Sequence, residues 1–194
     1  NLVHSITPSP NNTITPSLNN TITPSLIPTY KTHIKTIFNC SLERAFKTPM
    51  LCDVTKVHSG FLFMPRVTHC TEDENWGKTG GSRKVFMEKN IFFKGGEAAL
   101  DTVLIRKENK YWKIEISDFK MPFIGIEKLQ GEWEVQENEK GTVQVIYTYH
   151  LFSKHSWMYL FHWYFTKTFW KIYMKHAMEN IREMAYSNEP YVQN

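Results

Sequence analysis

Residues 156–186 read SWMYLFHWYFTKTFWKIYMKHAMENIREMAY, a stretch without glycine or proline that predicts one long helix. At about 1.5 Å per residue, such a helix is about 45 Å long and crosses a whole small domain. One stripe consists of residues that recur at three- and four-residue steps: Phe165, Phe169, Ile172, Tyr173, His176, Ala177 and Met184. A cationic stripe that we expect in water consists of Lys167, Lys171, Lys175 and Arg182. The apolar stripe is too large for one neighbouring element, so we expect the upstream strands to wrap around it.

The same stretch can be interpreted at a membrane in two ways. A transmembrane helix needs about 20 predominantly apolar residues. Polar side chains interrupt every such window: Lys154, His155, His162, Lys167 and Lys171. A helix on a membrane surface, with a basic face and a Trp/Phe face, stays open as an alternative and would make weak membrane contact. The favoured interpretation is a core helix of a soluble domain.

The composition is unusual in its aromatic content. The chain has 194 residues, enough for one domain with a substantial core, and 14% of them are Phe, Trp or Tyr. These side chains can line a large apolar interior or a cavity. The net charge of +4 is mild and the charges are interspersed, which argues against a nucleic-acid partner.

Cysteine and histidine spacing gives no sign of a metal site or a cofactor. Cys40, Cys52 and Cys70 form no CxxC pair, which favours free buried thiols in a reducing compartment. Because no continuous apolar leader is visible either, we expect a cytoplasmic protein. The histidines are scattered without a metal-binding motif. Gly77-Lys78-Thr79 lacks the upstream glycine of a phosphate loop and is interpreted as a turn.

The N-terminal region contains a repeat with a period of eight: TPSPNNTI, TPSLNNTI and TPSLIPTY over residues 7–30. Proline in every copy, flanked by Ser, Thr and Asn, cannot sustain a helix or a buried strand. We expect residues 1–29 to be a disordered low-complexity arm. The folded domain is expected at residues 30–194.

The rest of the chain predicts strands with two short helices near the start. A first strand at 31–39 precedes a helix that Ser41 caps and Pro49 stops, and a second helical turn is expected at 51–58. Six further strands are expected at 66–71, 83–93, 97–106, 111–119, 128–136 and 142–152, with turns at residues 76–81 and at Gly95-Gly96. Two of these strands alternate cleanly, with Trp112, Ile114 and Ile116 on one face of the first and Val143, Val145, Tyr147, Tyr149 and Leu151 on one face of the second. The second face is the expected partner of the long helix.

This order resembles the helix-grip fold of the START/polyketide-cyclase (SRPBCC) superfamily, which includes the major birch pollen allergen. The resemblance covers about residues 30–186. Its carriers are residues 39–50, WGKTGGSR at 76–83, with a Gly-x-x-Arg pattern from Gly80 to Arg83, and GEWEVQENEKGTVQVIYTYHLF at 131–152. It implies an α+β fold: a curved seven-stranded antiparallel sheet around a long C-terminal helix, with two short helices after the first strand. It also implies a hydrophobic cavity between sheet and helix.

Two functions follow from such a cavity. The first is binding of a small hydrophobic ligand, by resemblance a lipid, a polyketide or another aromatic molecule. The expected ligand-binding residues, which could instead plug the cavity, are Arg83, Trp112, Trp133, Tyr147, Tyr149, Phe165, Phe169 and Tyr173. The second function is a cyclase- or dehydratase-like enzyme with an acid–base pair in the same cavity. Its candidate strand residues are Arg83, Glu88, Asp101, Asp118 and His150, of which His150 is expected outside. The oligomeric state stays open.

Overall fold

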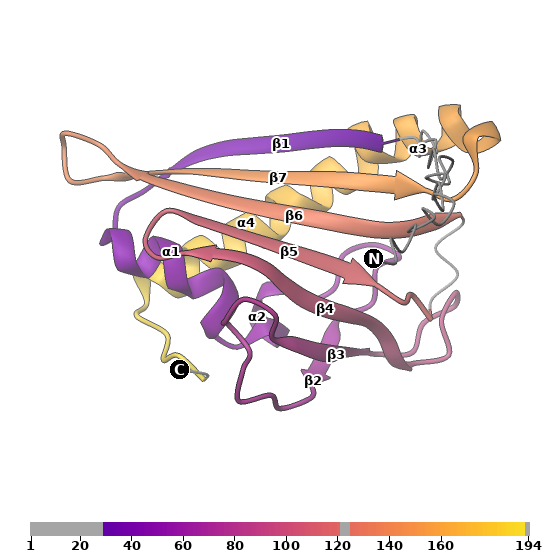
Figure 1. The fold of residues 1–194 in the computed structure, drawn as a ribbon, viewed down its shortest axis with the longest axis horizontal. Helices are drawn as coiled ribbons and strands as arrows, with labels where there is room; N and C mark the ends of the chain where they lie inside the picture. The colour runs from indigo at the N-terminus through magenta and orange to yellow at the C-terminus, as the bar shows by residue number, and fades with distance from the viewer. Residues whose placement is uncertain (1–28, 121–124, 193–194) are drawn as a thin grey trace, which may run out of the picture.

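The computed structural model describes residues 29–120 and 125–192, which form one sheet gripping a long helical segment (Figure 1). The repeat arm predicted for residues 1–29 lies, apart from Thr29, outside the described residues. The same is true of residues 121–124.

A seven-stranded antiparallel sheet forms the body of the molecule, in the order β1-β7-β6-β5-β4-β3-β2. The strands are β1 (Thr29–Phe38), β2 (Val67–Cys70), β3 (Ser82–Met87), β4 (Gly96–Lys107), β5 (Tyr111–Ser117), β6 (Ile126–Glu137) and β7 (Val143–Ser153). Consecutive strands from β2 to β7 are neighbours, and β1 closes the order by pairing with β7. The predicted fold class is confirmed.

The strand expected over residues 83–93 is shorter than predicted. It ends at Met87, and the side-chain carbonyl of Asn90 then accepts hydrogen bonds from the backbone N–H groups of Phe92 and Phe93. This local turn competes with the sheet for the same backbone groups. The loop between β3 and β4 is therefore longer than the two-glycine turn that the sequence predicts.

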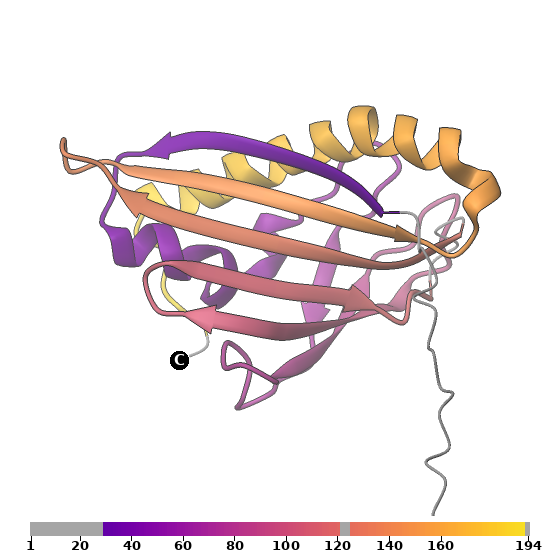
Figure 2. The ribbon, with the colours of Figure 1, turned by 45° about the horizontal axis from the view of Figure 1, so that its top comes forward.

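Helices cover the concave face of the sheet (Figure 2). The short helices α1 (Leu42–Leu51) and α2 (Val54–Val57) follow β1. The C-terminal helical segment consists of the 3-10 turn η1 (Ser156–Met158), α3 (Tyr159–Phe165), the π-helical turn η2 (Thr166–Trp170) and α4 (Lys171–Tyr186). None of the described helices is long and apolar enough to cross a membrane.

The C-terminal segment is helical over the predicted range, but the π turn changes which residues face the sheet. The hydroxyls of Thr166 and Thr168 both donate to the carbonyl four residues earlier, at 2.7 Å, and so compete with the backbone N–H groups of a regular α-helix. The buried side chains are Met158, His162, Thr166, Trp170, Tyr173, Met174, Ala177, Met178, Ile181, Met184 and Ala185. The predicted stripe is wrong at Ile172, which is 51% exposed, because the wide turn rotates the residues around it.

Helix α1 begins as predicted and ends later than predicted. The Ser41 hydroxyl accepts a hydrogen bond from the N–H of Arg44 and caps the helix. Pro49 was expected to stop the helix, yet α1 continues to Leu51. A proline removes the N–H that would bond the carbonyl four residues earlier, here that of Ala45. The indole of Trp133 in β6 donates to this carbonyl instead, at 3.0 Å, so the helix loses no hydrogen bond at this carbonyl.

Candidate functional site

A cavity of about 90 Å³ lies between the concave face of the sheet and helices α1, α2 and α4. Its walls are mainly apolar, with side chains from β2 to β7 on the sheet side. Binding pockets for drug-sized ligands usually have about 300–1,000 Å³, and an apolar cavity of about 150 Å³ holds benzene. The aromatic side chains therefore fill much of the interior but leave a space at its centre.

The polar wall of this cavity contains a buried ion pair on neighbouring strands. Arg83 on β3 and Asp101 on β4 are direct partners in the sheet register and point to the same, inner face. Both side chains are buried, and Arg83 Nε lies 3.7 Å from Asp101 Oδ2. Among the described residues Arg83 Nε has no acceptor at hydrogen-bonding distance. The Arg83 guanidinium also lies 3.6 Å from the centre of the Trp76 ring, in a cation–π contact.

Burial dominates the protonation of Asp101. It raises the pKa of this carboxyl from 3.8 to about 6, although the positive charge of Arg83 acts in the opposite direction. The pair is therefore a weak ion pair, and a pH below about 6 protonates Asp101 and leaves the positive charge of Arg83 unpaired. A buried carboxyl with a raised pKa in a cavity is typical of functional sites.

Phenol and imidazole groups complete the polar wall. Tyr147 donates to the Tyr149 hydroxyl at 2.9 Å, and burial raises the pKa of both phenols. One of the two hydroxyl protons lies between the oxygens, so the other can be donated to a third group. The Tyr173 hydroxyl lies 2.8 Å from Nδ1 of His58, whose pKa burial lowers from 6.5 to about 4. Near neutral pH, His58 is therefore an uncharged imidazole.

Tryptophans that line the cavity also hold helix α1 on the sheet. Three indole N–H groups donate to backbone carbonyls of α1: Trp76 to Met50 at 2.9 Å, Trp112 to Phe46 at 2.8 Å and Trp133 to Ala45 at 3.0 Å. Because buried indoles need such partners, these contacts fix the positions of the rings. The tryptophans form the rigid part of the wall.

Small and flexible residues form the adaptable part of the wall. Gly131 on β6 lines the cavity, and a Cβ there would lie 3.1 Å from the Tyr149 ring, so the absent side chain makes room for that ring. Met50, Met64 and Met87 also line the cavity. Methionine has several rotatable bonds and can repack around a ligand. The space can therefore grow without movement of the tryptophans.

The structure brings together most of the residues that the sequence predicts for ligand binding. Those that line the cavity are Arg83, Trp112, Trp133, Tyr147, Tyr149 and Tyr173. Phe165 and Phe169 do not line it; both are partly buried and pack against the core outside the cavity. Phe169 stacks on Phe63 with ring centres 4.0 Å apart.

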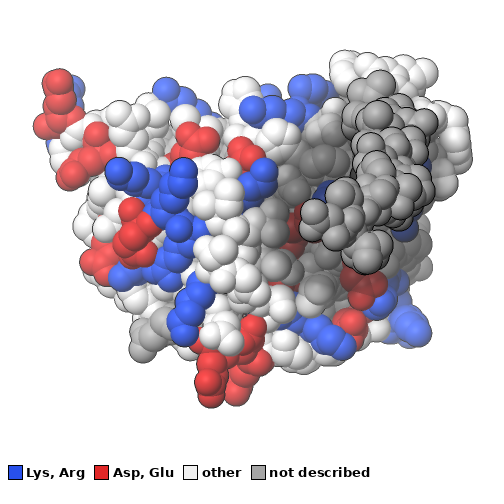
Figure 3. Space-filling view, viewed as in Figure 1, with Lys and Arg blue, Asp and Glu red and all other residues white. Residues whose placement is uncertain are grey.

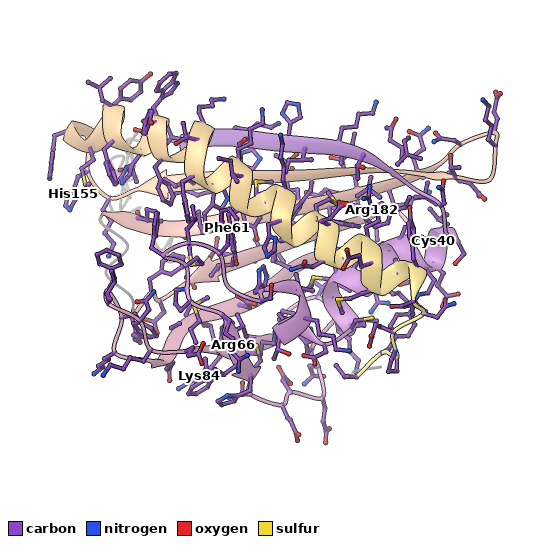
Figure 4. The ribbon with its side chains drawn as sticks, turned by 180° about the vertical axis from the view of Figure 1, so that it is seen from behind. Cys40, Phe61, Arg66, Lys84, His155 and Arg182 are labelled. Atoms are coloured by element: carbon purple, nitrogen blue, oxygen red, sulfur yellow. The ribbon has the colours of Figure 1, made fainter. Side chains whose placement is uncertain are left out.

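The candidate acid–base residues separate into an inner and an outer group. Arg83 and Asp101 face the cavity. Glu88 is exposed and pairs with Arg66, which Figure 4 places in the lower part of the view, below the C-terminal helix. Asp118 pairs with Lys120 on the surface, and His150 on β7 lies beside Glu132, on the face opposite Tyr149.

Sequence reasoning missed other residues of the cavity. His58 lies in the segment after α2 and has no neighbouring motif that would mark it, and Trp76 lies in a stretch interpreted only as a turn. That turn has a strict requirement at Gly81, where a Cβ would lie 2.0 Å from the Asn75 carbonyl oxygen. Within residues 29–120 and 125–192, no group of His, Cys, Asp or Glu could hold a metal ion, and the cysteines there are free thiols.

Comparison with known proteins finds solved structures with a similar fold but no protein that is related in sequence. No family model matches the chain, and no curated protein matches it. Solved structures do match, among them the crystal structure of Ara h 8.0201, a Bet v 1-like protein. The likeness has a TM-score of 0.56 at 13% sequence identity and covers 83% of this chain and 100% of that chain. The chain therefore has the helix-grip fold of the Bet v 1-like proteins.

Proposed function

We propose that this chain is a distant member of the SRPBCC superfamily and that its cavity binds a small, mainly apolar molecule. The observation that supports this most is a largely apolar cavity with one polar wall formed by Arg83, Asp101 and Tyr149. Burial of ligand surface at about 25 cal/mol per Å² supplies the affinity, and the polar groups orient the ligand. Lipids of ordinary size far exceed a space of about 90 Å³, and even a molecule of one or two rings requires the methionines of the wall to repack and enlarge it.

The polar wall favours a neutral ligand with a hydroxyl or carbonyl group. Near pH 7 the charges of Arg83 and Asp101 offset each other, so a ligand with a net charge gains no counter-ion there. Arg83 Nε and a tyrosine hydroxyl can donate to a ligand oxygen, while Asp101 can accept from a ligand hydroxyl. A phenol meets both requirements.

Binding of naphthol, measured by its fluorescence, tests the proposal. We expect saturable binding to the full chain, with weaker binding of naphthoate because its charge is uncompensated. Ala99→Leu places a larger side chain in the cavity and should abolish binding. The matched control is Thr102→Leu, on the opposite face of β4, which should bind like the wild type. Equal naphthol binding by both variants would show that the cavity is not the site.

A second candidate function is acid–base catalysis on the same class of molecule. Asp101 favours it, because a carboxyl with a pKa of about 6 can accept a proton near neutral pH, and Arg83 beside it can stabilise an enolate. The test is exchange of the α-hydrogens of acetophenone in D₂O, followed by NMR. If the protein is a catalyst, exchange should be faster than in buffer alone. The Asp101→Asn variant should lose this acceleration, and the Glu88→Gln variant should keep it. Exchange at the buffer rate with bound acetophenone would eliminate this function.

A further inference from the structure

The start of the C-terminal helical segment exposes a cluster of large apolar side chains, which we name the aromatic tip. Its members are Trp157, Tyr159, Leu160, Phe161, Trp163 and Tyr164. Their exposed fractions range from 48% to 79%. Large apolar patches are rare on the surface of a soluble monomer and mark interaction sites.

A loop at the same end of the molecule adds further exposed apolar side chains. In the antiparallel sheet, the end of β7, where the helical segment begins, lies at the same end as the turn from β3 to β4 (Figure 1). Ile91 and Phe92 in that turn are 88% and 59% exposed. Phe63 connects the β3–β4 turn with the π turn that follows the aromatic tip, because its ring stacks on Phe169 and lies 6.3 Å from Phe92.

Lysines flank both apolar regions. Along the outer side of the helical segment, Leu160 and Tyr164 of the aromatic tip are followed at helical spacing by three exposed lysines: Lys167, Lys171 and Lys175. Exposed Lys89 and Lys94 flank the β3–β4 turn as well, where the exposed carboxylate of Glu88 pairs with Arg66. The sequence between Glu139 and Glu179 contains no Asp or Glu. In Figure 3 the visible atoms of the aromatic tip, at the upper right, are white.

This combination has the chemistry of a membrane interface. Trp and Tyr prefer the level of the lipid head groups, and lysines beside an apolar region bind anionic head groups while their stems cover apolar surface. A second copy of the chain is a less suitable partner, because pairing of two such tips would bring their lysines together. The charges therefore favour a negatively charged lipid surface.

Ring contacts connect the aromatic tip with the cavity. Phe161 lies 6.2 Å from Phe165, and Phe165 lies 6.1 Å from Trp170, which lines the cavity. Figure 4 shows the course of the C-terminal helical segment, with His155 at its start and Arg182 near its far end. The aromatic tip and the wall of the cavity therefore belong to one continuous set of ring contacts, which ends at the buried Trp170.

We propose that the aromatic tip and the β3–β4 turn dock the protein on an anionic membrane surface. The test is co-sedimentation of the full chain with vesicles of phosphatidylcholine alone, and with vesicles of phosphatidylcholine and phosphatidylserine in equal parts. The mixed vesicles should bind the protein and shift its tryptophan emission to shorter wavelength, since Trp157 and Trp163 enter the interface. High salt should weaken binding.

Variants identify the surface. Trp157→Ser with Trp163→Ser should weaken binding about tenfold or more, because both rings lose their burial in the interface. Lys171→Gln should weaken it about fivefold. The matched control is Ile37→Ser with Ile105→Ser, since these side chains are exposed at the opposite end of the sheet.

Failure of the docking proposal can be distinguished from failure of the ligand proposal. The tip variants leave the cavity residues unchanged, so their binding of naphthol can be measured separately. Full vesicle binding by the double tryptophan variant would overturn the docking proposal. Equal binding to neutral and anionic vesicles would also overturn it. If light scattering shows a dimer that the tip variants convert to a monomer, and the protein does not bind vesicles, the tip is a surface for self-association instead.

Discussion

Asp101→Asn and His58→Asn should change the pH dependence of stability in opposite directions. The pKa of Asp101 is raised from 3.8 to about 6, so between these values the folded protein binds this proton more tightly than the unfolded chain does. At 1.36 kcal/mol per pKa unit, the free energy of unfolding falls by about 3 kcal/mol as the pH rises through this window. The pKa of His58 is lowered from 6.5 to about 4, so the unfolded chain binds that proton more tightly. Stability from His58 therefore rises by about 3 kcal/mol as the pH rises through its window.

The pH-dependent contributions of Asp101 and His58 to stability nearly offset each other in the wild type. Each variant removes one contribution, so that the pH dependence of the other can be measured. Asparagine resembles the protonated form of Asp101, so Asp101→Asn should match the wild type near pH 4 and exceed its stability by about 3 kcal/mol at pH 7. The free energy of unfolding of His58→Asn, relative to that of the wild type, should fall by about the same amount between pH 4 and pH 7. Urea denaturation followed by tryptophan fluorescence, at several pH values, measures both differences. The control Glu88→Gln affects an exposed pair with Arg66 and should change stability by less than about 1 kcal/mol.

The result usually seen for a well-formed buried ion pair would refute this reasoning. Removal of one partner of a well-formed buried pair destabilises a protein by about 3–5 kcal/mol. If Asp101→Asn loses that amount at pH 7, Arg83 stabilises the carboxylate by more than burial destabilises it. The raised pKa of Asp101 would then be wrong, and the carboxyl would no longer have the property that is typical of functional sites.

Two further predictions concern packing and thiols. Trp133→Phe should destabilise the protein by about 1–3 kcal/mol in urea denaturation, because it leaves the Ala45 carbonyl without a donor. Pro49→Ala supplies the missing N–H and should recover most of this loss in the double variant, so additive effects would contradict the account of α1. Burial raises the pKa of the Cys70 thiol to about 11, so alkylation at pH 8 should be slow in the native protein and fast in urea. Equally fast alkylation in both conditions would show that this thiol is accessible.

The strands were predictable from the runs between turn residues, and the inward-facing side chains of β5 and β7 from the period of two within a strand. Trp112 on β5 and Tyr147 on β7 belong to clean alternations, and both side chains face the cavity. Arg83 and Asp101 also face inward, but the sequence does not distinguish them from the other charged residues of their strands, such as Lys84 on β3. Their pairing depends on the register between β3 and β4, which a sequence pattern does not determine.

The features that the sequence did not predict depend on contacts between distant residues. Pro49 fits inside α1 because Trp133 comes from another element of the sheet. The π turn rotates Ile172 outward through local threonine hydroxyls that compete with the helix, an effect absent from a regular helical period. The volume of the cavity depends on the conformations of many side chains at once. The position of His58 depends on the packing of Tyr173 against it.

Native mass spectrometry of the full chain, as purified and after incubation with naphthol, tests the central claim that the cavity binds a small apolar molecule. The account predicts one bound molecule per chain, released on denaturation and absent from the Ala99→Leu variant. The mass of the bare chain in both samples would contradict the claim and would mean that the aromatic side chains are simply the core of the fold.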